Sequence, residues 1–280
     1  MQRFILLTTS IVTENTEKLE RMIDSLRGYH ASSDIQIKHV LLLQKTSEEQ
    51  AKALSESLSF PEWTQVLSDE RMLPLSVARN IMLNHVHASS EVIDNDTVVA
   101  FPDDDCWYPE GFLSYIAATF QAPKTAFLFC RYGTQTVAVA KASPLMVPTY
   151  KDLVFNASSN TLFLRWSVVK KMGAFNELLG VGAKYNGGED LDFALRAYRI
   201  AAEGTYWTNT PLVGHRDKVN DMKGDYFIGS ALVLRNNALY SPAACYHFIR
   251  KCIIGCYLVV QGKMPVNRLL QLFARSFRRV

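Results

Sequence analysis

The hydrophobic and polar positions of residues 1–120 follow two alternating repeats. Short apolar runs, typical of buried strands, alternate with segments whose apolar residues recur every three or four positions, as in helices. The predicted strands are Arg3–Ile11, Ile37–Leu43, Thr64–Leu67 and Thr97–Phe101. The predicted helices are 14–28, one opened by a capping box at Ser47–Gln50, Leu75–His87, and one with Pro109 in its first turn. This order predicts an α/β fold with a Rossmann-like, mostly parallel sheet.

The pattern of residues 121–280 is more mixed. It predicts a short helix ending at Gly173, a helix over 189–202, and helical structure from Gly229 to the end. The predicted extended segments are Ala126–Cys130, Val137–Ala140, Thr161–Arg165 and Tyr206–Val213. We expect a single domain over 1–225, with halves at about 1–120 and 121–225, and a helical tail over 226–280.

Charge divides the chain at the same place. The 280 residues carry a formal net charge of +3. Residues 226–280 contain eight Lys and Arg and no acid, whereas residues 1–225 contain 22 Lys and Arg against 27 Asp and Glu. The tail therefore carries +8 and the rest −5, which favours an anionic surface as a partner of the tail.

The cellular compartment is predicted from the chain start and the cysteines. The first residues do not form a secretory signal, and no run reaches the ~18 apolar residues that span a bilayer. The five cysteines form no CxxC pair, and an odd number indicates reduced thiols. We expect a cytoplasmic protein.

Three consecutive acids, Asp103, Asp104 and Asp105, directly follow the predicted strand Thr97–Phe101. Ligands of open α/β sheets bind beyond the carboxyl ends of the strands, and in extended chain Asp103 and Asp105 point the same way. Two carboxylates on one side suit Mg²⁺ or Mn²⁺ bound to a diphosphate. The alternative is an acidic turn that caps the helix near Pro109, although three adjacent acids exceed what a turn requires.

Three further groups of residues have a structural and a functional interpretation. Glu189 and Asp190 follow two glycines at a predicted helix start, where acids also simply complement the helix dipole. His215 follows an extended segment and bears on metal binding only if it converges with the acids. Arg79 and Asn80 lie near a helix start, a place that favours phosphate, but a surface arginine there is equally ordinary.

These features, in this order, resemble the family 2 glycosyltransferases of the A-type, nucleotide-diphospho-sugar fold. The resemblance covers FILLTTSIVTEN, LSVARN, FPDDDCWYPEGFL, and VVKKMGAFNELLGVG followed by GGEDLDFALR, up to about Asp217. It implies Asp105 as metal ligand, Asp103 and Asp104 on the donor side with Asp103 near the ribose or metal, and His215 as a further ligand. It also implies Asp190 as general base, with Glu189 beside it.

The resemblance places the nucleotide near Thr8 and Thr9, with Asp69 as a weaker candidate and Arg79 and Asn80 on the donor side. Two departures leave the base open. Thr8-Thr9-Ser10-Ile11 stands where the family often has Pro-Thr, and Gln44-Lys45 replaces an acid. A UDP-sugar is the expected donor.

The tail has the pattern of basic amphipathic helices. Its apolar positions are Val266, Leu269, Leu270, Phe273 and Phe277, with an upstream stripe at Phe248, Cys252, Ile253, Cys256, Tyr257 and Val260. We expect residues 245–280 to lie on an anionic membrane surface. Packing on the body or on another subunit of a homo-oligomer is the alternative. No nucleic-acid partner is expected, since no nucleic-acid motif accompanies the charge.

The resulting hypothesis is an inverting, metal-dependent glycosyltransferase on the inner face of the membrane, acting on a saccharide or lipid-linked acceptor in polysaccharide or lipopolysaccharide synthesis. One alternative is a sugar nucleotidyltransferase, but Thr8–Asn15 lacks the glycine and basic residues expected of a triphosphate loop. Another is a non-catalytic module that binds saccharide or scaffolds a membrane complex. The acids at Asp103, Asp105 and Asp190 argue against it.

Overall fold

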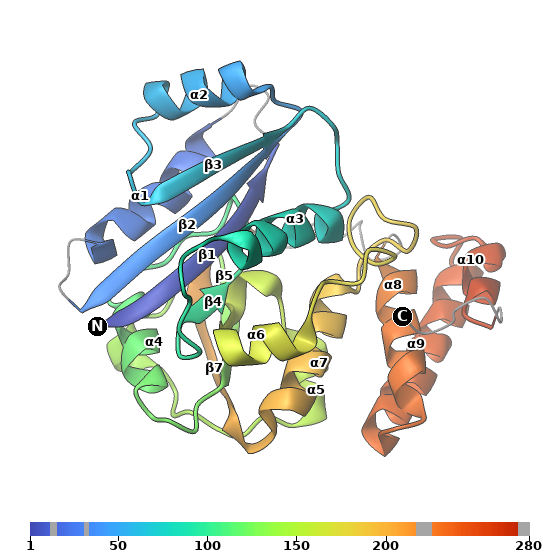
Figure 1. The fold of residues 1–280 in the computed structure, drawn as a ribbon. Helices are drawn as coiled ribbons and strands as arrows, with labels where there is room; N and C mark the ends of the chain where they lie inside the picture. The colour runs from blue at the N-terminus through green and yellow to red at the C-terminus, as the bar shows by residue number, and fades with distance from the viewer. Residues whose placement is uncertain (12–15, 31–33, 217–225, 274–280) are drawn as a thin grey trace.

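A computed structural model describes residues 1–11, 16–30, 34–216 and 226–273. Within these residues a seven-stranded sheet has the order β3-β2-β1-β4-β6-β5-β7 (Figure 1). The strands are β1 (Gln2–Ser10), β2 (Ile35–Gln44), β3 (Thr64–Asp69), β4 (Val98–Ala100), β5 (Phe127–Gly133), β6 (Leu162–Arg165) and β7 (Thr205–Gly214). Strands β3, β2, β1 and β4 run parallel, and only β6 is antiparallel to its neighbours. The predicted α/β fold and mostly parallel sheet are confirmed.

Helices cover both faces of this sheet. They are α1 (Glu17–His30), α2 (Glu48–Ser57), α3 (Leu75–Ala88), α4 (Phe112–Phe120), α5 (Tyr150–Asn156), α6 (Trp166–Met172), α7 (Glu189–Ala201), α8 (Phe227–Ala238), α9 (Pro242–Val260) and α10 (Val266–Gln271). Short 3₁₀ turns lie at η1 (Val139–Lys141), η2 (Ser159–Thr161) and η3 (Ala202–Gly204). The capping box predicted at Ser47 is present, with Gln50 N–H donating to the Ser47 hydroxyl.

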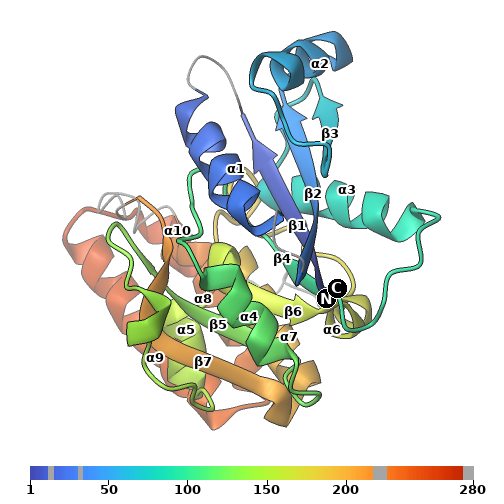
Figure 2. The ribbon, with the colours of Figure 1, turned by 90° about the vertical axis from the view of Figure 1, so that its left-hand side faces the viewer.

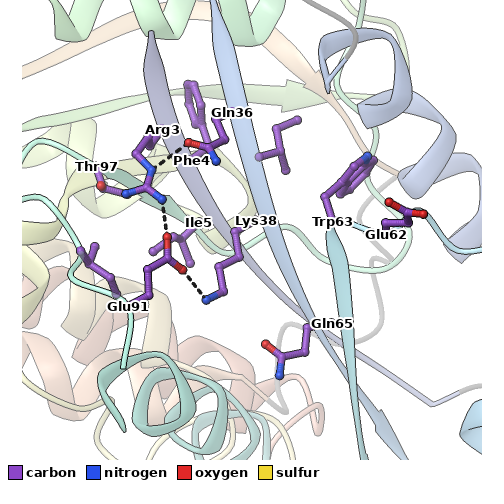
Figure 3. Close-up of a pocket in the computed structure, with 12 residues that line it drawn as sticks. Arg3, Phe4, Ile5, Gln36, Lys38, Glu62, Trp63, Gln65, Glu91 and Thr97 are labelled. Carbon is purple, nitrogen blue, oxygen red and sulfur yellow. Dashed lines mark hydrogen bonds and ion pairs between the residues drawn. The ribbon is translucent and has the colours of Figure 1, made fainter. Parts of the chain in front are cut away.

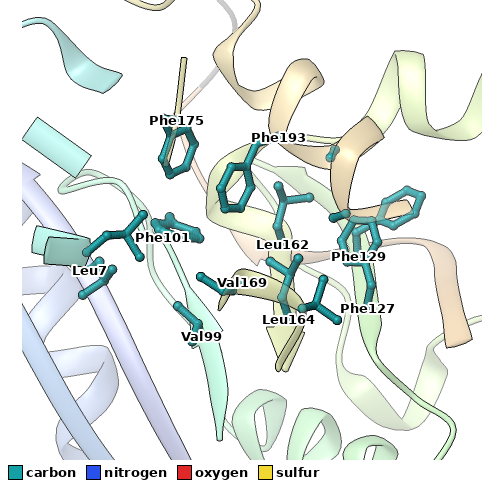
Figure 4. Packing of buried hydrophobic residues seen from close by; sticks show 14 of the residues in the cluster. Leu7, Val99, Phe101, Phe127, Phe129, Leu162, Leu164, Val169, Phe175 and Phe193 are labelled. Carbon is teal, nitrogen blue, oxygen red and sulfur yellow. The ribbon is translucent and has the colours of Figure 1, made fainter. Parts of the chain in front are cut away.

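Side-chain alternation along the strands builds one hydrophobic layer on each face. On β1, Phe4 and Leu6 belong to one layer together with residues of α1 and α4, whereas Ile5 and Leu7 belong to the other together with residues of α3, α6 and α7. Figure 2 shows these helices on the two faces of the sheet. In the second layer Phe175 and Phe193 stack at 4.0 Å between ring centroids, with Phe101 edge-on to both (Figure 4). Phe193 belongs to α7, so this aromatic packing holds the start of that helix against the hydrophobic layer.

Two sequence predictions in this region are wrong. Val137–Ala140 is not a strand: Val137 N–H donates to Pro211 O, but Pro211 has no N–H to continue a ladder. The segment enters η1 instead, where Ala138 O and Val139 O accept from the amides of Lys141 and Ala142. Pro109 is not in a helix, because Gly111, with φ of 78°, interrupts the backbone and α4 begins only at Phe112.

The helices after Tyr226 pack on the body and on one another. Val233 and Leu234 of α8 belong to the layer beneath α7, while Phe227 and Leu232 pack with α9 and α10. The division into a catalytic part and a tail stays a prediction, with α8 in contact with both. The expectation that no segment is long enough to span a bilayer needs correction, since α9, by length and composition, is long and apolar enough to do so.

Candidate active site

The three acids lie where the pattern of β4 places them, at the carboxyl edge of the parallel strands. A short antiparallel bridge ties this segment to the end of β7, with Trp107 N–H donating to Gly214 O at 3.0 Å and the return bond at 2.9 Å. Gly214 is required for this approach, because a Cβ there would lie 1.9 Å from the Trp107 ring. The bridge carries the next residue, His215, over the acids.

Asp103, Asp105 and His215 form a cluster whose potential ligand atoms all lie within 4.8 Å of one another. His215 Nε2 is 3.0 Å from Asp105 Oδ1 and 3.6 Å from Asp103 Oδ2. The convergence that sequence alone left conditional is therefore present. Two carboxylate oxygens and one imidazole nitrogen form a donor set that fits Mn²⁺, since imidazole suits transition metals better than Mg²⁺.

The charges around this cluster hold the Asp105 carboxylate ionised. Burial lowers the pKa of His215, but hydrogen bonds with Asp103 and Asp105 outweigh this and raise it to about 10. Burial raises the pKa of Asp105, but His215 and Arg216 lower it by a larger amount, so the net shift is downward. Arg216 Nε lies 2.9 Å from Asp105 Oδ2. With its pKa at about 10, His215 carries a proton between the two acids, so a cation that took its imidazole as a ligand would have to displace this proton.

Asp104 points away from this cluster. Its Oδ2 accepts a 2.6 Å hydrogen bond from the Ser10 hydroxyl at the end of β1. Burial raises the pKa of Asp104, Ser10 lowers it, and the neighbouring acids raise it, with a net upward shift. Asp104 therefore links β4 to the β1 end rather than adding a third carboxylate to the cluster.

Arg79 connects the cluster of Asp103, Asp105 and His215 to the start of α7. Its side chain is 3% exposed and donates to Asp190 Oδ1 at 2.8 Å and to Asp103 Oδ1 at 3.3 Å. A third bond, at 2.6 Å, goes to the Ser159 hydroxyl, and Ser159 N–H donates to Asp190 Oδ2 at 3.0 Å. Burial lowers the pKa of Arg79, but the carboxylates raise it more. Arg79 is thus placed to position two acids, and its predicted contact with phosphate stays a prediction.

The two acids of the glycine-rich helix start have different environments. The Asp190 side chain is 25% exposed, whereas Glu189 is buried beneath the 176–188 loop, with its Cβ 3.5 Å from a Cβ built on Gly180. Burial and the adjacent Asp190 raise the pKa of Glu189. Of the pair, only Asp190 is both accessible and held by two donors, which favours it as the group that faces a substrate.

The residues expected around the nucleotide base are spread along the carboxyl edge. Thr8 is fully buried, and its hydroxyl has no hydrogen-bond partner among the described residues. The Thr9 hydroxyl accepts from Gln44 Nε2 at 2.8 Å. Asp69 is bound by the backbone and guanidinium of Arg71, which lower its pKa to about 2. These positions are compatible with a pocket beside β1 and β2, but donor contacts there stay predictions.

Asn80 does not face that edge. Its amide exchanges hydrogen bonds with the backbone of Phe175 and donates to Glu177 Oε1 at 3.0 Å. It is 5% exposed and anchors the start of the loop that precedes α7. These bonds give Asn80 a structural role, and its predicted contact with the donor stays a prediction.

Sequence reasoning missed several members of the network. Gln44 bridges Thr9 and the Leu73 backbone amide, with its Oε1 accepting at 2.7 Å, although sequence treated it only as a departure from the family pattern. Arg216 was identifiable as the neighbour of His215. Ser159 has no local signal, because it reaches Arg79 only through the fold.

The described cavities do not coincide with this cluster. One, of about 550 Å³, lies at the amino ends of β1 and β2, where Arg3 binds Gln36 and Glu91 and Lys38 binds Glu91 (Figure 3). Another, of about 660 Å³, lies between α2 and β3 and is lined partly by Asp69. In the first cavity Arg3 and Lys38 both pair with Glu91, and neither cavity contains Asp103, Asp105 or His215.

We expect Arg79→Lys to lower kcat about tenfold to a hundredfold while changing Mn²⁺ affinity less. An ammonium group cannot reproduce the fork that contacts both Asp190 and Asp103, and the closer bonds go to Asp190 and Ser159. Steady-state kinetics and Mn²⁺ titration measure the two effects separately. The matched control is Arg196→Lys, at an arginine that pairs with Asp192 on α7. Equal losses in both variants would contradict a positioning role specific to Arg79.

Comparisons with known proteins identify the fold. No protein-family model matches the chain, and no curated protein matches it. S. aureus TarS (1–349) in complex with UDP-GlcNAc aligns over 85% of this chain and 66% of that chain, with 16% identity and a TM-score of 0.62. The mannosyltransferase PcManGT from Pyrobaculum calidifontis, in complex with GDP-Man and Mn²⁺, aligns over 89% and 68%, with 13% identity and a TM-score of 0.53.

These likenesses confirm the predicted A-type glycosyltransferase fold. The chain spans less than two thirds of the TarS chains, 65% of one and 43% of another. At these identities the similarity establishes architecture, and membership of family 2 stays a prediction.

Proposed function

We propose that this protein is an inverting glycosyltransferase that moves a sugar from a nucleotide-diphosphate donor to an acceptor hydroxyl. One observation carries the proposal. A metal-type cluster of Asp103, Asp105 and His215 is connected through a single buried arginine, Arg79, to the partly exposed carboxylate of Asp190. A metal-binding acid cluster and a separate carboxylate are the two parts that such a displacement needs.

The reaction forms a bond between the acceptor oxygen and the anomeric carbon while the bond from that carbon to the diphosphate oxygen breaks. Asp190 takes the hydroxyl proton, and the nucleoside diphosphate leaves with the electron pair. A divalent cation held by Asp103, Asp105 and His215 would offset the charge of that leaving group. Direct displacement inverts the anomeric centre and needs no nucleophilic side chain. Glu189, buried behind Asp190, is proposed to orient it.

Mn²⁺ and a UDP-sugar are the proposed cofactor and donor. The imidazole of His215 favours Mn²⁺ over Mg²⁺, and a similar fold in TarS holds UDP-GlcNAc. We place Asp104, Thr8, Thr9 and Asp69 on the donor side. The acceptor is proposed to be a saccharide, lipid-linked or part of a surface polysaccharide, reached from the cytoplasm.

A thermal-shift panel of UDP-, GDP-, ADP- and dTDP-sugars tests the donor class. At a donor concentration about a hundred times Kd, binding adds about 2.7 kcal/mol, which corresponds to a rise in Tm of about 5 °C for a chain of this size. We expect this rise with a UDP-sugar and Mn²⁺ and its loss in EDTA. A rise in Tm with a GDP-sugar alone would show that the donor is a GDP-sugar. No rise in Tm with any nucleotide sugar would contradict the proposal of a nucleotide-sugar enzyme.

A further inference from the structure

One face of α9 is apolar and unpartnered within the described residues. Five side chains, Tyr246, Ile249, Ile253, Tyr257 and Val260, recur at helical spacing along it and are all exposed, Ile253 by 65% and Val260 by 85%. We call these five residues the apolar ridge. A helix face turned to water normally carries charged residues, and a contiguous exposed apolar strip marks an interaction surface.

The opposite face of α9 is fixed against the body. Gly255 packs so closely that an added Cβ would lie 2.8 Å from the Phe227 ring of α8. Lys251 points inward as well: its Nζ donates to the Ser230 hydroxyl at 2.8 Å, and burial lowers its pKa to about 8. Sequence placed Phe248 and Cys252 on one apolar stripe with Ile253, Tyr257 and Val260, but Phe248 and Cys252 pack inward with α8. The helix is thus apolar on both sides, and only one side is covered.

Helix α10 packs against α9 at the outer side of the molecule (Figure 1) and also carries exposed apolar residues. Val266, Leu270 and Phe273 are exposed there, while Leu269 and Leu272 face α8 and α9. The predicted stripe on this helix is therefore divided between a packed and an exposed side. Phe277 lies outside the described residues.

Charge selects the occupant of this surface. From Tyr226 to the last residue the sequence has eight basic residues and no acid. Among the described ones, Lys263 is exposed next to the end of the apolar ridge and Arg250 borders it, whereas Lys251 and Arg235 bond inward, to Ser230 and to Leu272 O. A second copy would bring two such basic segments together, at an electrostatic cost, whereas anionic lipid headgroups are complementary to them. We propose that the apolar ridge seats the protein on an anionic lipid bilayer.

The geometry favours lying on the bilayer over crossing it. Arg250 and Lys251 stand at the middle of α9, so a spanning helix would place two charges at the bilayer centre. Crossing would also break the contact of Gly255 with Phe227 and the bond from Lys251 to Ser230. An interfacial helix keeps these contacts and buries only the apolar ridge.

The same contacts connect the apolar ridge to the candidate active site. On α8, Gly229 lies against the loop before α7, where an added Cβ would be 1.8 Å from Gly187 O. The apolar ridge on α9 is therefore connected to the start of α7, which carries Asp190, through two close contacts: Gly255 with Phe227, and Gly229 with Gly187. A protein seated through α9 would hold that helix start at a constant orientation to the membrane.

The test is cosedimentation of the full chain with vesicles, in the absence of donor and metal. We expect binding to vesicles of phosphatidylcholine with phosphatidylglycerol, weak binding to phosphatidylcholine alone, and a loss of about tenfold or more with Ile253→Glu. Tyr257→Glu should act in the same way. Val92→Glu is the matched control, because Val92 is 88% exposed and lies outside α9. Unchanged melting by circular dichroism shows that each variant is folded.

Two outcomes would overturn the proposal. If both ridge variants bind vesicles as tightly as the wild type, the apolar ridge does not contact the lipid surface. A chain that ignores vesicles but sediments as a dimer, and becomes monomeric with Ile253→Glu, would show that a second copy occupies it. Because donor and metal are absent, neither outcome depends on sugar transfer.

Discussion

Replacing Asp105 with Ala is expected to lower kcat/KM for glycosyl transfer by about a thousandfold, or about 4 kcal/mol of transition-state stabilisation. Asp105 lies at the centre of the cluster, with one carboxylate oxygen 3.0 Å from His215 Nε2 and the other 2.9 Å from Arg216 Nε. Its loss removes one of three potential metal ligands and the partner that orients His215. Mn²⁺ titration without donor should show a parallel loss of affinity, measured by calorimetry or by electron paramagnetic resonance.

Folding and chemistry can be separated in this experiment. Asp105→Asn preserves the side-chain volume of this buried site, and Arg216, whose side chain is 61% exposed, can be solvated when its partner is lost. The matched control is Glu110→Gln, which removes a negative charge from an exposed residue of the same loop. Wild-type Mn²⁺ affinity in both Asp105 variants, or full turnover in EDTA, would show that the cluster is not a metal site.

Replacing Asp190 with Asn is expected to lower kcat by about a thousandfold, within the range that removal of a general base produces. The amide is isosteric, but its single oxygen can replace only one of the two acceptors, because Arg79 donates to Oδ1 and the Ser159 amide to Oδ2. It cannot take a proton from an acceptor hydroxyl. Donor affinity, measured by thermal shift with Mn²⁺, should stay close to that of the wild type.

Asp192→Asn provides the comparison within the same helix turn. Asp192 pairs with Arg196 at 2.9 Å, and both side chains are partly exposed, so this pair should contribute under about 1 kcal/mol to stability and nothing to turnover. A near-normal kcat for Asp190→Asn would exclude Asp190 as the base. Loss of donor binding together with kcat would instead indicate that the Arg79 network, rather than proton transfer, had been disturbed.

Most of the strands could be predicted from sequence, because side-chain period is a local property. The apolar runs of β1, β2 and β3 are found where predicted, and the capping box at Ser47 marks a helix start. Helix α5 was missed even though Thr149 and Asp152 form the same motif. The start of α4 was placed too early, because the positive φ of Gly111 outweighs the preference of Pro109 for a first helical turn.

Residue order alone accounts for the α/β architecture, for acids at the end of β4 and for a basic, apolar chain end, since each depends on neighbours within a few positions. Contacts between distant segments depend on the fold. His215 reaches Asp105 only because the Trp107–Gly214 bridge joins the ends of two elements, and Arg79 contacts Asp190 only because α3 and α7 share one hydrophobic layer. In the same way, α9 has apolar residues around most of its circumference, so its sequence does not show which face is turned outward. Packing against α8 covers one side of α9 and leaves the other exposed.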